Sequence, residues 1–158
     1  MRITWRELVV DLSGQSSDDL LSEWRWLVPS TFSLGIVSAL GDGFLFDEDG
    51  CIFWLDVGGA ELTKIAETKV QFDQLRQQPD RAKQWFAPQI VGDLLASGKV
   101  LTTGQCFSYI KPLTLGGPFA PTNFNVCSVS VHFGTLGQIQ RQVKHLPIGT
   151  PITSVKLA

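Results

Sequence analysis

Two glycine-bearing turns constrain this chain most, because they divide one apolar region into three short segments. The segments are 43–46, 51–56 and 61–66. Asp47-Glu48-Asp49-Gly50 joins the first two, and Asp-Gly is a strong hairpin signal because glycine takes a positive φ without steric cost. Val57-Gly58-Gly59-Ala60 makes the next turn. Alternating apolar residues between such turns predict an antiparallel meander.

Helical patterns flank this meander. Ser16 and Ser17 precede Asp18 and Asp19, which is typical of a helix start with polar caps and early acids, and the helix is expected over 18–28. Further helices are expected from Thr68 to Gln78, from Pro79 through Phe86, from Pro88 to Gly98 and from Leu136 to Pro147, with extended segments over 34–40, 101–110 and 125–131.

The predicted fold class is α+β: an antiparallel β-sheet with a meander core, flanked by helices. The length fits one domain of ordinary size. We interpret residues 1–158 as that domain, with a helical N-terminal part over 1–33 and the sheet and helices over 34–152.

Charge is segregated along the chain. Every Asp and Glu lies before Leu94, and no Lys or Arg lies between Arg25 and Lys64. From Leu94 to the C-terminus there is no Asp or Glu, and the Lys and Arg residues are Lys99, Lys111, Arg141, Lys144 and Lys156. Charge patterning bears on partners and association rates rather than on fold. The acidic region therefore indicates a surface for a basic partner.

The candidate partner-binding residues are the acids around the two turns and the tryptophan between them. Tryptophan inside a charged rim is the usual composition of an interface hot spot. The plainer alternatives are a solvated hairpin tip for the acids and a core position for the tryptophan. The candidate set is Asp42, Asp47, Glu48, Asp49, Trp54 and Asp56.

Other function classes lack their residues. The five C-terminal cations form no cluster of the kind that phosphate binding needs, so no nucleic acid partner is expected. No phosphate loop and no zinc-ligand spacing occurs, so neither cofactor nor metal is expected. No stretch approaches the roughly 20 apolar residues of a membrane span. The N-terminal residues lack the apolar core of a signal peptide, and a cytoplasmic protein is expected.

The cysteines leave an enzyme as one alternative. Cys51, Cys106 and Cys127 contain no CxxC pair and are interpreted as buried thiols. A small thiol enzyme would use Cys127 or Cys106 as nucleophile, with His132 as a base for Cys127. If 125–131 is a strand, Cys127 and His132 lie about 16 Å apart. A self-associating scaffold domain is the other alternative.

Several ordered motifs resemble a known family. The motifs are Ala39-Leu-Gly-Asp-Gly-Phe44, Ile52-Phe-Trp-Leu-Asp-Val-Gly-Gly59, Leu62-Thr-Lys-Ile-Ala66, Leu115-Gly-Gly-Pro-Phe119 with Asn123, Val131-His-Phe133 and Leu136-Gly-Gln-Ile139. With these motifs, the chain resembles across 34–152 the C-terminal domain of bacterial type VI secretion immunity proteins, and the first thirty or so residues resemble the helical N-terminal part of such proteins less closely.

This resemblance implies an α+β domain similar to the SUKH immunity fold. It also implies a cytoplasmic antidote that binds a cognate protein toxin, which in the best-known branch is a DNase. Neither catalysis nor a cofactor is implied. The expected partner is therefore a toxin, with a nuclease as the leading class, and no membrane or nucleic acid. The chain itself is expected to be a monomer or a weak homodimer.

Overall fold

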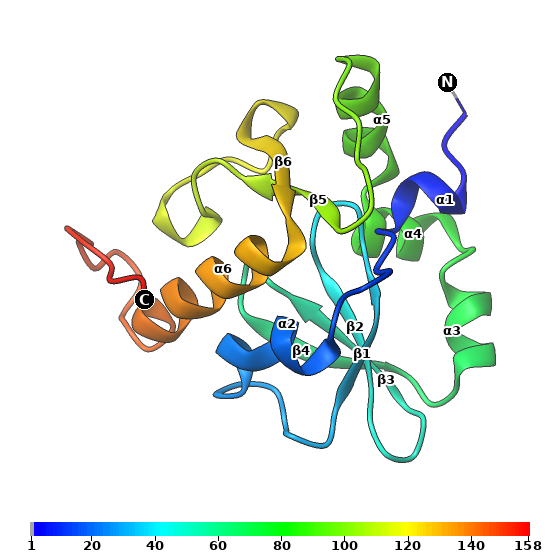
Figure 1. The fold of residues 1–158 in the computed structure, drawn as a ribbon, viewed down its shortest axis with the longest axis horizontal. Coiled ribbons are helices and arrows are strands. Elements are labelled where there is room, and N and C mark those ends of the chain that lie inside the picture. Colours follow the sequence, from blue (N-terminus) through cyan, green and yellow to red (C-terminus); the bar gives the residue numbers. More distant parts are fainter. Residues whose placement is uncertain (1) are drawn as a thin grey trace.

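A four-stranded antiparallel sheet forms the centre of the fold, in the order β1-β2-β3-β4 (Figure 1). The structure is a computed structural model that describes residues 2–158. The strands are β1 Ser33–Val37, β2 Gly43–Phe46, β3 Ile52–Asp56 and β4 Glu61–Ala66. This sheet is the meander predicted from the two turns, and the α+β class is confirmed.

A bulge explains the one break in the alternating pattern of β4. Phe53 pairs with Lys64, but the next pair joins Ile52 to Ala66, so Ile65 is an extra residue on β4. An inserted residue shifts the side chains that follow it to the other face of the sheet. In a regular strand, Ala66 would lie on the same exposed face as Lys64. Because of the bulge, it lies on the opposite face and is buried.

A second, two-stranded sheet leads directly into the longest helix. β5 Gln105–Tyr109 pairs with β6 Phe124–Ser128, and α6 Val129–Val143 follows without a loop. The strand expected over 125–131 thus ends at Ser128. The reason is a helix cap: the Ser128 hydroxyl accepts a hydrogen bond from the Val131 N–H at 3.2 Å. Val129 and Val131 favour a strand by their β-propensity, but the Ser128 cap starts a helix at this point.

The remaining helices are short. Thr68 caps α3 as expected, since its hydroxyl accepts from the Gln71 N–H at 3.1 Å. The helix expected over 18–28 is shorter and ends in a 3-10 turn. The bounds are α1 Trp5–Leu8, α2 Ser17–Leu21, η1 Ser22–Trp24, α3 Lys69–Leu75, α4 Pro79–Phe86, α5 Pro88–Ala96, η2 Leu113–Leu115 and η3 Pro121–Asn123.

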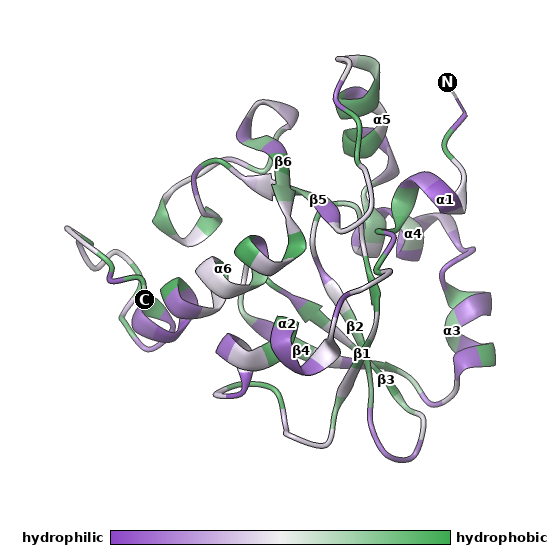
Figure 2. Cartoon of the chain, in the orientation of Figure 1, coloured by the Kyte–Doolittle hydropathy of each residue, from purple (hydrophilic) through white to green (hydrophobic). Residues whose placement is uncertain are grey.

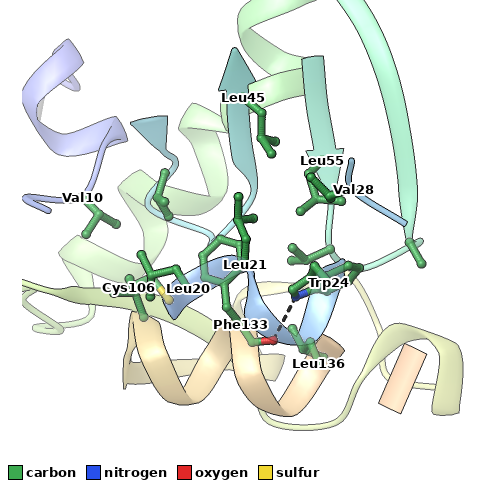
Figure 3. Packing of buried hydrophobic residues seen from close by; sticks show 14 residues of the cluster. Val10, Leu20, Leu21, Trp24, Val28, Leu45, Leu55, Cys106, Phe133 and Leu136 are labelled. Atoms are coloured by element: carbon green, nitrogen blue, oxygen red, sulfur yellow. Dashed lines mark hydrogen bonds between the residues drawn. The ribbon is translucent and has the colours of Figure 1, made fainter. Parts of the chain in front are cut away.

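The two faces of the sheet are covered by different helices. Successive β2 side chains point to opposite faces, so Leu45 packs in the cluster with α2, η1 and α6, whereas Phe44 packs against the aromatic side chains of α3 and α4. Figure 3 shows the first cluster, in which the Trp24 indole N–H donates to the Phe133 carbonyl at 2.9 Å. The aromatic rings of Phe44 and Phe86 stack at 5.0 Å in the second.

Candidate functional site

The six candidate residues fall into two groups at opposite ends of the β2–β3 hairpin. Asp47, Glu48 and Asp49 form the turn that follows the pair Phe46–Ile52. Asp42, Trp54 and Asp56 lie at or near the opposite end of the hairpin, where Gly43–Leu55 is the last strand pair. At about 3.3 Å per residue, the two ends are separated by roughly 10 Å along the strands. The fold therefore does not gather the six into one cluster.

The hairpin tip presents two carboxylates to solvent and uses a third to shape the turn. One Asp47 carboxylate oxygen accepts from the Asp49 N–H at 3.0 Å and from the Cys51 N–H at 2.8 Å. Glu48 and Asp49 are exposed, and neither forms a salt bridge among residues 2–158. Figure 2 shows the hydrophilic character of this tip. Glu48 and Asp49 are thus free to meet a partner.

The acids at the other end are hydrogen-bonded inside the protein. Asp42 accepts from the indole N–H of Trp54 at 3.2 Å and from the Val57 N–H at 3.1 Å. Asp56 accepts from the Gly58 and Gly59 N–H groups at 3.1 and 3.2 Å. Together they hold the turn between β3 and β4 against the end of β2, and Trp54 is half-buried beside them.

Burial changes the ionisation of this pair. Burial, with a further contribution from the negative charge of Asp56, raises the pKa of Asp42 to about 8, although the N–H donors of Val57 and Trp54 act in the opposite direction. Burial also raises the pKa of Asp56, against the two glycine N–H groups. Asp42 is therefore largely protonated at neutral pH and adds little negative charge to the surface.

Folding also neutralises part of the charge segregation. The Lys144 ammonium lies 2.9 Å from a Glu61 carboxylate oxygen, and the Arg141 guanidinium lies 4.0 Å from Glu23. These pairs join cations of the C-terminal half to acids of the N-terminal half. The hairpin tip keeps its net negative charge because neither pair includes it.

A buried histidine links α6 to the loop before β2. His132 is 1% exposed. Its Nε2 lies 2.9 Å from the Gly41 carbonyl, which can only accept, so Nε2 carries the proton and Nδ1 accepts from the Ser108 hydroxyl at 2.6 Å. Gly41 has φ +88°, and a Cβ there would lie 2.0 Å from the imidazole. The Gly-Asp-Gly motif thus supplies the close approach that this histidine needs.

This serine–histidine pair is poorly suited to catalysis. A general base works best with a pKa near the operating pH. Burial lowers the pKa of His132 to about 4, so the imidazole is a weak base at neutral pH. The sequence pointed to His132 as a possible base and to Gly41 as part of a family motif, but not to Ser108 or to contact among the three, because partners so distant in the chain leave no local signal.

The thiols are likewise unreactive by environment. Burial raises the pKa of Cys51, Cys106 and Cys127, which keeps each sulfur protonated. The strand-based spacing of Cys127 and His132 is wrong because the chain turns into α6 at Val129. Among residues 2–158, no three or more His, Cys, Asp or Glu side chains are placed to hold a metal ion. In the same part of the chain, no helix is long and apolar enough to cross a membrane.

Comparison with protein families gives a direct match in the second half of the chain. Residues 66–140 match the family described as "T6SS immunity protein Tdi1, C-terminal". Over this segment, a little less than half of the chain, the sequence is similar to that type VI secretion immunity family. The resemblance to that family is thereby confirmed over the end of β4 through most of α6. All six candidate residues lie before the segment that matches the Tdi1 C-terminal family.

One solved structure shares the fold. It is described as "Crystal structure of Atu4351 from Agrobacterium tumefaciens", and it superposes with a TM-score of 0.53 at 15% sequence identity. The superposition covers 77% of this chain and 64% of that chain, so the chain spans less than two thirds of the solved one. At this identity the likeness concerns the fold alone. No curated protein matches the sequence.

Proposed function

We propose that this protein is an immunity protein that neutralises a cognate bacterial toxin by binding it directly. The observation that carries the proposal is the match of residues 66–140 to the Tdi1 C-terminal immunity family. The toxin acts as a protein ligand, with a nuclease as the leading class, and the encounter takes place in the cytoplasm. The antidote works stoichiometrically, as a monomer or a weak homodimer.

The protein acts without catalysis in this proposal. Its support is chemical: the thiols have raised pKa values, and the imidazole of the Ser108–His132 pair has a pKa of about 4. A nucleophile needs a low pKa or an effective base to be activated. Uniformly slow alkylation of the three cysteines in the folded protein is the expected result, and one hyper-reactive thiol would favour the thiol enzyme instead.

The hairpin is the proposed site of electrostatic attraction to the toxin. Glu48 and Asp49 are the proposed direct contacts, because they are exposed and form no salt bridge within the described residues 2–158. Asp47 holds their turn in shape through its two N–H contacts. Asp42 and Asp56 organise the other end of the hairpin, where half-buried Trp54 is the proposed anchor. Charges at a rim mainly speed association, whereas a buried aromatic side chain slows release.

Co-expression with the product of the adjacent reading frame tests the proposal. Growth of cells that produce this product should be rescued by the chain, and the two proteins should purify together. The Asp42→Ala variant, which should lose folded protein, is expected to rescue poorly. Asp93→Asn, which removes an exposed carboxylate from α5, should rescue as the unmodified chain does. Growth arrest that persists with soluble chain present, and no co-purification, would reject this function.

A further inference from the structure

A groove of about 340 Å³ lies between α6 and the β5–β6 ribbon. Two large apolar side chains at its wall are mostly exposed: Ile110 at 64% and Val131 at 57%. Exposed apolar side chains that converge on one concave surface are typical of an interaction site. We call this surface the α6 groove. Its apolar wall consists of Ile110, Pro112, Val126, Val131, Leu136 and Ile139.

We propose that the α6 groove receives an apolar segment of the cognate toxin, and that this segment carries a carboxylate beside its apolar side chains. The proposal rests on the proposed function and assigns it a second contact surface. The groove lies wholly within residues 66–140, which match the immunity family. The acidic hairpin lies outside that segment, so a toxin contact made by the family segment itself would use another surface, and this groove is one.

Several polar groups in the wall are already hydrogen-bonded within the protein. Sites for small molecules combine an apolar lining with a few polar groups that are free to orient the ligand. Here the Ser108 hydroxyl and the His132 imidazole are hydrogen-bonded to each other at 2.6 Å. The Asn125 amide oxygen accepts from the Val126 N–H at 2.9 Å. Among residues 2–158, the Thr135 hydroxyl and the Asn125 amide nitrogen keep no side-chain hydrogen bond in this lining, so recognition by the groove is mainly apolar contact with two polar groups beside it.

The charge around the groove selects the partner's flanking residues. No Asp or Glu follows Asp93, so none of the elements that form the groove carries a carboxylate. Lys111 lies between the lining residues Ile110 and Pro112, is exposed at the rim with its ammonium beside Gly116, and forms no salt bridge in the part of the chain that the structure describes. A toxin carboxylate at this rim, next to the inserted segment, would pair with the ammonium once the flexible lysine side chain turns toward it. One lysine is too little for nucleic acid, which needs several convergent cations.

The groove and the hairpin tip are separate surfaces. In Figure 1, β6 lies in the upper middle of the molecule with α6 beginning below it, and the tip of the β2–β3 hairpin lies at the lower edge. A toxin that touches both must extend around the sheet. Because the two surfaces are distant, variants of each should act additively on binding.

Binding of purified protein to the adjacent reading frame's product, made by cell-free synthesis, tests the groove. Val131→Asp and Ile110→Asp should each weaken the affinity about 30-fold or more, as expected for hot-spot positions. Lys111→Glu should weaken it less, and more at low salt than at high salt. Val70→Asp is the matched control, because Val70 is 68% exposed and, like Val131, lies in the first turn of a helix. An acid there suits the helix dipole, so both variants should fold.

The outcomes separate the groove from the function on which it rests. No binding by the unmodified chain would overturn the proposed function, and the groove assignment with it. Binding by the unmodified chain that survives both groove substitutions would overturn the groove alone. A dimer that Val131→Asp dissociates, with toxin binding unchanged, would assign the groove to a second copy of this chain and also overturn the proposal. Loss of binding in the groove variants, with Val70→Asp unaffected, supports it.

Discussion

The two ends of the β2–β3 hairpin hold the same kind of residue in opposite environments. At the tip, Glu48 and Asp49 face solvent and form no salt bridge with any of residues 2–158. At the other end, Asp42 and Asp56 are turned inward and accept hydrogen bonds from backbone and indole N–H groups. Acids that look equivalent in the sequence therefore divide into a solvated charge that can attract a partner and an internal acceptor that holds a turn.

The need for buried acceptors explains the difference. Buried N–H groups in folded proteins are almost always paired. The turn after β3 presents the N–H groups of Val57, Gly58 and Gly59, which have no strand partner, and the two carboxyl groups accept from them. At the tip, water can reach the backbone, and only Asp47 is used in this way.

The largest effect is expected from Asp42→Ala. The substitution leaves the Trp54 indole N–H and the Val57 N–H without acceptors, and an orphaned buried donor costs about 1–3 kcal/mol. We expect the free energy of unfolding of Asp42→Ala to lie about 2 kcal/mol or more below that of Asp42→Asn, which keeps a carbonyl acceptor and likewise cannot ionise, in urea denaturation at pH 7. Asp49→Ala should change the unfolding free energy of the unmodified protein by less than about 0.5 kcal/mol. Equal losses from the two variants would show that the two ends of the hairpin do not differ.

The pH dependence of stability should carry the signature of the buried end. The folded-state pKa of Asp42, about 8, is raised above its unfolded value of 3.8, so the folded protein binds the extra proton between these values. Its contribution to stability is fully present below pH 3.8 and is lost as the pH rises through 8. The pKa of His132 is lowered from 6.5 to about 4, so the unfolded protein binds the extra proton between these values. The contribution of His132 to stability therefore increases as the pH rises from about 4 to 6.5.

The interval from about pH 6.5 to 8 therefore isolates the carboxyl pair. Unfolding free energy should decrease with pH over this interval in the unmodified protein, and less steeply in Asp42→Asn, which cannot ionise at that position. Glu48→Gln is the matched control and should leave the slope unchanged. Denaturation series at several pH values measure it, and a slope that Asp42→Asn leaves intact would assign the titration elsewhere.

Local signals were sufficient to predict much of this fold from the sequence. The Asp-Gly turn, the Thr68 cap and the prolines that begin α4 and α5 act over a few residues, and each lies where the pattern indicates. The start of α6 is not predicted from the sequence because its valine-rich first turn resembles a strand. The helix start depends on a single capping residue, Ser128. The immunity family was recognised from motifs rather than from chemistry.

The candidate site was less predictable because burial is a long-range property. Nothing near Asp42 in the sequence shows that Trp54 and Val57 will supply it with N–H donors, since the meander brings them together only after folding. The α6 groove is also formed by segments far apart in the chain, and its residues read individually as ordinary apolar positions. Charge pattern indicated the exposed tip and could not separate it from the buried pair.

A smaller effect should follow from Asp47→Ala at the tip. This change removes the acceptor of the Asp49 and Cys51 N–H groups. Water can partly replace it in an exposed turn, so the loss of unfolding free energy should be about 1 kcal/mol, in the range for one exposed side-chain hydrogen bond. Asp47→Asn keeps a carbonyl oxygen and should retain most of the stability. A loss as large as that of Asp42→Ala would place Asp47 in the buried class.

The smallest effect on stability, and a specific effect on binding, is expected from neutralising the free tip. The double change Glu48→Gln and Asp49→Asn removes two exposed charges, keeps the side-chain sizes, and leaves the turn sequence as Asn-Gly, which suits a hairpin equally well. Unfolding free energy should change by less than about 0.5 kcal/mol.

Association with the toxin should slow by roughly three- to tenfold at low ionic strength, and the difference should shrink as salt screens the attraction. Asp93→Asn, an exposed carboxylate on α5, serves as the control for a single lost charge at another place. Stopped-flow or surface-based kinetics over a salt series measure both rates. Because rim charges act on encounter, the dissociation rate should stay nearly constant, and an association rate that the double change leaves unaltered at low salt would remove the hairpin tip from the toxin contact.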